Sequence, residues 1–165
     1  MKRIVVIAHN IRSAHNVGAI FRTADGFGVE KVILSGYTPA PPFDGDTRLP
    51  HIAAKVGRDI HKTALGAENA VPFLVIEHPP LEELRREGYC LVALEQAPGS
   101  TPLPDYHPPE RVALLLGEEI NGISPDLLDR CHDIVEIPMV GTKESFNVSV
   151  AAAVALYQLA CIEYN

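Results

Sequence analysis

The sequence has few cysteines and no long apolar run, and these two shortages exclude several classes of protein. Its cysteines, Cys90, Cys131 and Cys161, are widely spaced and form no Cys-X-X-Cys pair. Their odd number and spacing argue against a disulfide framework and a cysteine-rich zinc site. No apolar stretch approaches the roughly 20 residues that cross a bilayer, and the run 4–8 is too short for a signal peptide. We therefore expect a cytoplasmic protein outside membranes.

Several familiar catalytic and nucleotide-binding signatures are also missing. Gly26-Phe27-Gly28 lacks a third glycine, and it ends a predicted helix where a dinucleotide fingerprint would open one. The sequence contains no phosphate-binding P-loop and no Gly-X-Ser-X-Gly nucleophile elbow. His9 and His15 have no acidic or cysteine partners at ligand spacing, so the sequence predicts no metal site.

Basic residues are fewer than acidic ones, 14 against 21, and the formal net charge is −7. This balance counts against a nucleic-acid partner, because contacts to phosphate need Lys and Arg. Net charge is an average, however, and a local cluster of cations can still bind RNA. Hydrophobic residues (47%) and charged residues (21%) are in the proportions of an ordinary globular domain, so the composition alone leaves the function open.

Short apolar runs alternate with helical stretches, as in α/β proteins. The pattern predicts strands over 4–8, 31–35, 73–76, 90–94, 112–116 and 134–137 and helices over 13–27, 51–56, 81–87, 124–131 and 148–162. Segments 37–50 and 97–109 are predicted loops, and 62–68 is ambiguous. With no internal repeat or linker, residues 1–165 are expected to form one α/β domain with a parallel sheet flanked by helices.

Polar turns follow three of the predicted buried strands. They are Glu95-Gln96, Gly117-Glu118-Glu119 and the segment 138–141. In open parallel sheets, ligands bind beyond the carboxyl ends of the strands. These three turns therefore predict a nucleotide pocket.

Two segments that follow predicted strands carry polar residues with both a functional and a plain structural explanation. In 10–23, Asn16 and Arg22 either flank a site or serve as a helix cap and a solvated charge. In 114–124, the glycine and two carboxylates after the strand either form part of a site or make a polar turn before the next helix.

A third segment, 137–149, opens the apolar C-terminal helix with Ser145, Asn147 and Ser149. Capping explains one of these three polar residues but leaves the other two, and the Ile-Pro-Met-Val-Gly stretch, without a structural reason.

Taken together, the three segments resemble the SPOUT superfamily, specifically its SpoU (TrmH-like) branch of RNA ribose 2′-O-methyltransferases. The motifs appear as 16–28, as 116–124, and as 137–141 with 145–151. Each motif alone is weak, but the order and separation of all three are specific, and the resemblance covers nearly the whole chain. The chain is similar to a minimal form of the family, without an added RNA-binding domain.

The resemblance implies a sheet whose C-terminal part is threaded into a deep trefoil knot. It also implies a homodimer that pairs through the first and last helices, with each active site completed by the partner. S-adenosylmethionine would be the cofactor, held mainly by backbone groups after three strands. The cofactor-binding residues implied are Leu94, Glu95, Gln96, Leu116, Gly117, Ile137, Met139, Ser145, Asn147 and Val148.

Position by position, the catalytic residues implied by the resemblance are Arg22, Asn16, Glu119, Ser145 and Asn147. Glu118 falls at a variable position of the second motif, and Phe146 stands where leucine is more usual. Because a guanidinium is effectively always protonated, we expect Arg22 to orient the nucleotide and stabilise negative charge.

RNA contacts are expected from a local basic set despite the acidic total. The set is Arg12, Arg22, Lys55, Arg58, Lys62 and Lys143. The substrate implied is RNA, with tRNA preferred. Methylation of ribosomal RNA and a non-catalytic module that binds S-adenosylmethionine or a nucleotide are the alternatives.

Overall fold

The computed structural model describes residues 2–162 and contains one seven-stranded parallel sheet. The strands are β1 (Arg3–His9), β2 (Lys31–Ser35), β3 (Phe73–Ile76), β4 (Cys90–Leu94), β5 (Thr101–Pro102), β6 (Arg111–Leu116) and β7 (Asp133–Glu136). Their order across the sheet is β3-β2-β1-β6-β4-β7-β5, with every neighbouring pair parallel. This confirms the predicted α/β class; the knot itself stays a prediction.

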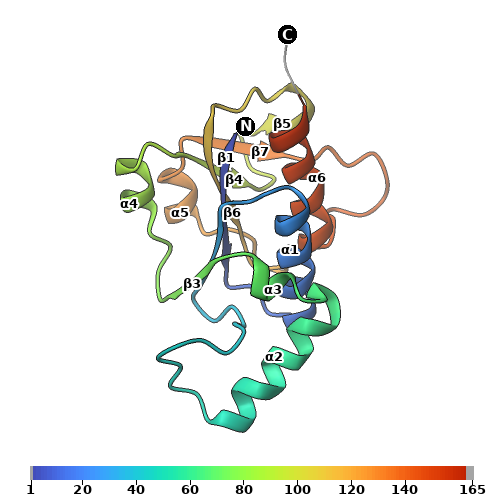
Figure 1. Ribbon diagram of the computed structural model, residues 1–165. Coiled ribbons are helices and arrows are strands. Elements are labelled where there is room, and N and C mark those ends of the chain that lie inside the picture. The colour runs from blue at the N-terminus through green and yellow to red at the C-terminus, as the bar shows by residue number, and fades with distance from the viewer. Residues whose placement is uncertain (1, 163–165) are drawn as a thin grey trace.

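Helices cover both faces of the sheet (Figure 1). They are α1 (Ala14–Gly26), α2 (Pro50–Ala64), α3 (Ala67–Ala70), α4 (Leu81–Arg86), α5 (Pro125–Asp129) and α6 (Val148–Cys161), with a 3₁₀ turn, η1 (Leu103–Asp105). Helices α1 and α6 lie on one face, and α4 and α5 lie on the other. None of the helices within residues 2–162 is long and apolar enough to cross a membrane.

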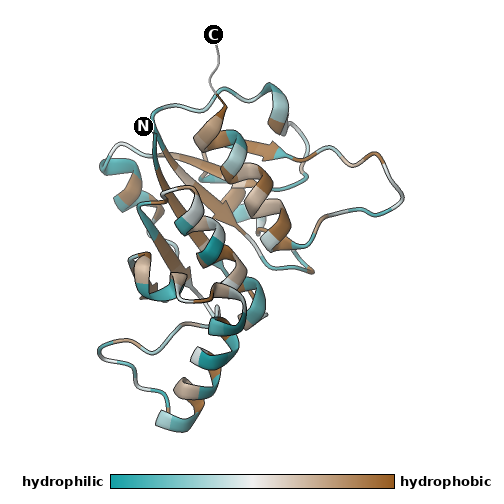
Figure 2. Ribbon diagram, turned by 45° about the vertical axis from the view of Figure 1, so that its right-hand side comes forward, coloured by the Kyte–Doolittle hydropathy of each residue, from teal (hydrophilic) through white to brown (hydrophobic). Residues whose placement is uncertain are grey.

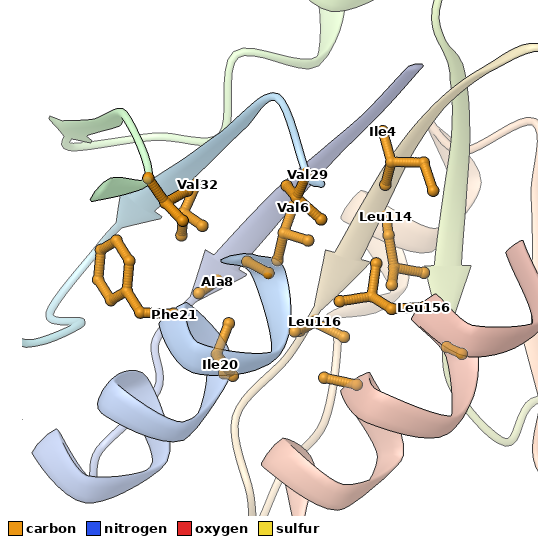
Figure 3. Close-up of a cluster of buried hydrophobic side chains, with 14 of the residues drawn as sticks. Ile4, Val6, Ala8, Ile20, Phe21, Val29, Val32, Leu114, Leu116 and Leu156 are labelled. Atoms are coloured by element: carbon orange, nitrogen blue, oxygen red, sulfur yellow. The ribbon is translucent and has the colours of Figure 1, made fainter. Parts of the chain in front are cut away.

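The central strands are buried on both faces, and alternate side chains enter two separate cores. In β1, Val6 belongs to the core under α1 and α6, whereas its neighbours Val5 and Ile7 belong to the core under α4 and α5. Figure 3 shows the first core, where Phe21 from α1 and Leu156 from α6 pack toward the sheet. Burial on both faces explains why these strands appear in the sequence as continuous apolar runs.

The predicted strands are confirmed to within one residue at each end, but the helix predicted over 51–56 is much too short. Helix α2 runs from Pro50 to Ala64. Gly57 resembles a helix stop in the sequence, yet it lies inside the helix. The position favours glycine because a Cβ there would lie 2.8 Å from Pro42 Cδ. Strand β5 is not predicted from the sequence, because it has only two residues and no repeating pattern of its own.

Helix α1 begins where the sequence predicts and is fixed against α2. Ser13 caps it by accepting a hydrogen bond from the Asn16 amide over 3.3 Å. A Cβ on Gly18 would lie 2.2 Å from the Ile60 carbonyl oxygen, so only glycine allows this approach. Thr63 Oγ1 donates to the His15 carbonyl over 2.7 Å at the same crossing.

Residues 36–64, here named the α2 arm, extend beyond the carboxyl ends of β1 and β2 (Figures 1 and 2). Within the loop of this arm, Arg48 donates to Asp46 and to the carbonyl oxygens of Ala40 and Pro41 over 2.5–3.3 Å. Hydrogen bonds from Arg48 outweigh burial and lower the pKa of Asp46 to about 2. These contacts give the loop a defined shape although it has no regular secondary structure.

Candidate cofactor and active site

A cavity of about 300 Å³ opens at the carboxyl ends of β4, β6 and β7, which is within the usual range for small-molecule sites. Its wall comes from the segments that follow these three strands and from the start of α6. The lining residues are Leu94, Glu95, Gln96, Leu116, Gly117, Glu118, Glu119, Ile120, Asn121, Gly122, Glu136, Ile137, Glu144, Ser145, Phe146, Val148 and Ala151. The strand-end position of the cavity matches the pocket that the sequence predicts.

Residues 117–123, here named the β6 turn, form one side of the cavity. The backbone of Glu118 and Gly122 pairs in both directions, over 2.9 and 3.2 Å. A Cβ on Gly117 would lie 2.5 Å from Ile123 Cγ1, and one on Gly122 would lie 2.2 Å from Glu95 Oε2. Gly122 also has a positive φ of 66°, which favours glycine. The turn is therefore closed tightly on itself.

Glu95 attaches the β6 turn to the end of β4. Its Oε2 accepts a hydrogen bond from the Ile123 amide over 2.9 Å, and its Oε1 accepts one from the Gln96 amide over 2.9 Å. One carboxylate thus fixes two walls of the cavity relative to each other.

A chain of hydrogen bonds joins the three sequence motifs. Asn16 Nδ2 donates to Glu119 Oε1 over 2.9 Å, and Asn147 Nδ2 donates to Asn16 Oδ1 over 3.2 Å. Asn147 also caps α6, because its Oδ1 accepts from the Ser149 amide over 2.9 Å. Residues separated by more than 100 positions in the sequence therefore meet beside the cavity.

The hydrogen bonds around Glu119 stabilise its charged form. Burial acts to raise the pKa of this carboxyl group, but hydrogen bonds from the Asn16 side chain and the Arg12 amide outweigh it and lower the pKa. Glu119 is therefore a carboxylate at neutral pH, and it acts as the hydrogen-bond acceptor in these contacts.

Eight of the ten predicted cofactor-binding residues line the cavity, and two do not. Met139 is half-buried in the segment after β7, outside the cavity wall. Asn147 reaches Asn16 and not the cavity. Of the predicted catalytic residues, Glu119 and Ser145 line the cavity, and Asn16 and Asn147 are connected to it through the hydrogen-bond chain.

Arg22 stands apart from the other predicted catalytic residues. It is exposed on α1 and does not line the cavity. Its side chain has no hydrogen bond or ion pair with another residue of the described chain 2–162. One protomer therefore does not bring Arg22 into contact with the cavity or with Glu119.

The predicted RNA-binding cations other than Arg22 fall into three places. Lys55, Arg58 and Lys62 are exposed on α2, and Lys62 Nζ donates to Asp59 over 2.7 Å. Lys143 is exposed in the long segment between β7 and α6 that projects from the body (Figure 2). Arg12 lies beside the β6 turn, where its guanidinium pairs with a carboxylate of that turn.

Eight residues of the cavity wall are absent from the predicted site residues: Glu118, Ile120, Asn121, Gly122, Glu136, Glu144, Phe146 and Ala151. Glu118 occupies a variable position of the motif, yet its carboxylate is almost buried in the wall. Gly122 carries no signal in the sequence beyond that of a turn, and only the structure reveals its positive φ and close approach to Glu95. Across residues 2–162, no group of three or more His, Cys, Asp or Glu side chains is arranged to hold a metal ion.

The wall fits the cofactor that the resemblance implies. Leu94, Leu116, Ile137 and Val148 supply apolar surface for a flat ring system. Carboxylates and backbone groups of the β6 turn supply hydrogen-bond acceptors for hydroxyl and ammonium groups. The tight approaches at Gly117 and Gly122 keep the turn closed on itself and against Glu95.

Comparison with known proteins gives the same family as the motifs. Residues 3–157 match the model of the SpoU rRNA Methylase family. A 23S rRNA (guanosine-2′-O-)-methyltransferase, RlmB, from Neisseria meningitidis is 32% identical over 155 residues, which are 93% of this chain and 56% of that protein. The chain therefore spans little more than half the length of such curated relatives.

Solved structures agree with this match. A TrmH/SpoU tRNA modifying enzyme from A. aeolicus superposes with a TM-score of 0.78 at 25% identity, covering 97% of this chain and 75% of that one. The SpoU methyltransferase AviRb from Streptomyces viridochromogenes, solved in complex with AdoMet, has a TM-score of 0.77 at 23% identity, covering 96% and 57%. The chain described here belongs to the SpoU rRNA Methylase family.

Proposed function

We propose that this protein transfers a methyl group from S-adenosylmethionine to a ribose 2′-hydroxyl of RNA. The observation that carries the proposal is the hydrogen-bond chain of Asn16, Glu119 and Asn147, which joins all three family motifs at the edge of the cavity. The RlmB relative named as a guanosine-2′-O-methyltransferase, the A. aeolicus TrmH/SpoU tRNA modifying enzyme and the AdoMet bound in the SpoU methyltransferase AviRb support it.

When bound, S-adenosylmethionine supplies a methyl group on a positively charged sulfur. Transfer would form a bond between the ribose 2′ oxygen and the methyl carbon as the carbon–sulfur bond breaks, the sulfur would leave as a neutral thioether, and the hydroxyl proton would pass to solvent. Such an in-line displacement depends strongly on positioning. The wall residues would hold the cofactor, with Leu94, Leu116 and Ile137 on its apolar parts. Glu119 would keep Asn16 oriented, and Ser145 would contact the ribose.

Arg22 would stabilise negative charge at the attacking oxygen and contact an RNA phosphate, because its guanidinium stays protonated. Since Arg22 does not line the cavity of its own chain, this role requires a second subunit. We propose a homodimer through α1 and α6, with the partner's Arg22 completing each site. Val150, Val154 and Tyr157 are exposed apolar residues along α6, and the Tyr157 ring packs edge-on against that of Phe27, the residue directly after α1, with 6.3 Å between ring centroids. This apolar strip supports the helix pair as the contact surface.

Two classes of RNA, tRNA and ribosomal RNA, are candidates for the substrate. The sequence predicts tRNA, and the A. aeolicus relative is described as a tRNA modifying enzyme. The RlmB relatives, named for 23S rRNA, support ribosomal RNA at least as strongly. Both substrates would be met in the cytoplasm, the compartment predicted from the sequence.

The test is transfer of labelled methyl from S-adenosylmethionine to total tRNA and, separately, to ribosomal RNA that lacks modification. Label in an alkali-resistant dinucleotide establishes ribose methylation and identifies the RNA class. Cofactor binding without label in either RNA would contradict the enzymatic proposal and favour a non-catalytic binding module.

A further inference from the structure

Arg12 makes contacts that the other predicted RNA-binding cations lack. Its backbone amide donates to Glu119 Oε2 over 3.1 Å. Its guanidinium forms an ion pair with Glu118 Oε1. One residue of the loop between β1 and α1 therefore contacts two consecutive carboxylates of the β6 turn.

Glu118 depends on this contact because its carboxylate is nearly buried. Only 10% of its side chain is exposed. Its Oε2 accepts from Asn121 Nδ2 over 2.7 Å, whereas the buried Oε1 receives no hydrogen bond of regular geometry within residues 2–162. The Tyr37 side chain also interacts with this carboxylate, but it carries no positive charge. A buried charge is costly unless it is paired. Arg12 supplies the charge that compensates this oxygen.

The charge state of Glu118 agrees with this arrangement. The hydrogen bond from Asn121 lowers the pKa of the carboxyl group, burial opposes it, and the charge of Arg12 lowers it further. The pair thus forms between two charged groups at neutral pH, one on the β1–α1 loop and one on the β6 turn.

We propose that Arg12 is a positioning residue of the cofactor site, which holds the β6 turn in place through Glu118 and does not serve as an RNA contact. This inference rests on the proposed function in one respect, the identification of the cavity as the S-adenosylmethionine site. Six residues of the β6 turn line the cavity, from Gly117 to Gly122, so a shift of the turn changes the cofactor site directly.

The alternative role of Arg12, binding of an RNA phosphate, carries a cost that Arg58 does not have. The Arg12 side chain is 54% exposed and could turn toward solvent. Doing so would leave the buried Glu118 oxygen without its cation. Arg58 is exposed on α2 and has no ion pair with any residue between 2 and 162, so it is the matched control for a phosphate contact.

The experiment is a double-mutant cycle read by calorimetric binding of S-adenosylmethionine without RNA. Arg12→Ala is expected to weaken binding by about tenfold, within the range of coupled contacts. In a Glu118→Gln background, Arg12→Ala is expected to weaken cofactor binding by less than about threefold, because the neutral amide needs no counter-charge. Arg12→Lys, which retains a positive charge, is expected to stay close to the wild-type affinity.

RNA binding supplies the second readout. Filter binding of tRNA at several salt concentrations should give the same affinity and salt slope for Arg12→Ala as for wild type. Arg58→Ala should lower both. The proposal is overturned if Arg12→Ala lowers RNA affinity and salt slope while cofactor affinity is unchanged, or if its cofactor loss is equal in both backgrounds.

Thermal melting of the same four proteins separates this inference from the proposed function. If the wild type binds no S-adenosylmethionine, the proposed function fails, and the ion pair is still tested by melting. A stability loss from Arg12→Ala that disappears in the Glu118→Gln background supports the contact. Additive losses, or no loss in either background, would refute it. If Arg12→Ala does not fold, Arg12→Gln replaces it in the cycle.

Discussion

The β6 turn and the α2 arm lie beyond the same edge of the sheet but are built in opposite ways. In the β6 turn, charged side chains are paired and half-buried: Glu119 accepts from Asn16, and Glu118 pairs with Arg12. On the α2 arm, Lys55 and Arg58 are exposed, without hydrogen bonds from their side chains to other residues of the described chain.

This difference reconciles the acidic composition with the proposed RNA substrate. Carboxylates in the β6 turn form hydrogen bonds within the protein and line a cavity for a small molecule. Lys55 and Arg58 on the arm, unlike Arg48 and Lys62, are not paired with a carboxylate of the described chain and remain available to phosphate, whose attraction depends on local charge and not on the total. The comparison predicts that changes in the two regions affect different measurements.

The largest expected effect comes from the proposed catalytic role of Arg22, a residue that belongs to neither region within one chain. Arg22→Ala is expected to lower kcat for methyl transfer by about 10²–10³, the usual loss of one charge-stabilising donor. Cofactor affinity should not change, because Arg22 does not line the cavity. Single-turnover transfer and calorimetry measure the two quantities.

Arg22→Lys is the control for this prediction. It retains the charge but loses the planar fork, so an intermediate rate is expected. Full activity of this variant would contradict a specific role for the guanidinium. Mixing Arg22→Ala with a variant defective in the cavity should recover activity in mixed dimers if the partner's Arg22 completes the site.

The next effect concerns the joint between the α2 arm and the body. Gly18→Ala is expected to lower the free energy of unfolding by about 1–3 kcal/mol, typical of overpacking. The added Cβ would lie 2.2 Å from both the Ile60 carbonyl oxygen and Thr63 Oγ1. Urea unfolding measures the change. Gly26→Ala on the same helix is the control, because no heavy atom lies within 4 Å of the place that its methyl group would take; an equal loss there would contradict the packing explanation.

The same joint shows what a sequence can and cannot predict. Apolar residues at 53, 56, 60 and 64 of α2 repeat with helical spacing and are buried or half-buried, so the sequence does contain the pattern of a long helix. Gly57 obscures it, because glycine inside a helix usually signals an end. Its reason, the approach of Pro42 from the arm's loop, is a tertiary contact that no local pattern contains.

The candidate site likewise has features that the sequence predicts and features that depend on tertiary contacts. The strand ends and their polar turns could be predicted from apolar runs, because parallel strands place such turns at one edge. The partners of Asn16 could not, since Glu119 and Asn147 are 103 and 131 residues away. Without the structure, only the family resemblance groups them. Neither the local sequence pattern nor the family resemblance indicates the ion pair of Arg12 with Glu118. From the sequence, the charge of Arg12 therefore places it among the predicted RNA-binding residues.

A smaller effect is expected from the cations of the α2 arm. Each of Lys55→Ala and Arg58→Ala should reduce the slope of log affinity against log salt by about 0.7–0.9 for RNA, with cofactor affinity unchanged. Lys62→Ala should have less effect, because Asp59 already pairs with this lysine. Arg86 on α4, at the opposite face of the sheet, is the control. Equal slopes for all four variants would contradict RNA binding along the arm.

The smallest expected effect is a pH dependence of the free energy of unfolding that arises from Glu119 in the β6 turn. The pKa of Glu119 is lowered from its ordinary value of 4.5: burial opposes the shift, and the hydrogen bonds from Asn16 and the Arg12 amide outweigh it. Its contribution to stability is therefore complete above pH 4.5 and is lost as the pH falls through the lower folded-state pKa. At pH 7 the wild type should exceed Glu119→Gln by about 1 kcal/mol, the usual net contribution of one hydrogen bond.

That gap should close on acidification, because both proteins then carry a neutral side chain at position 119. Denaturant unfolding from about pH 7 down to about pH 3, below the ordinary carboxyl pKa, measures it, with Glu110→Gln as the control at an exposed glutamate. A gap that is constant with pH would mean that Asn16 binds the acid and the amide equally. In that case charge would not distinguish the β6 turn from the α2 arm, and the separation of cofactor and RNA functions would have to rest on geometry alone.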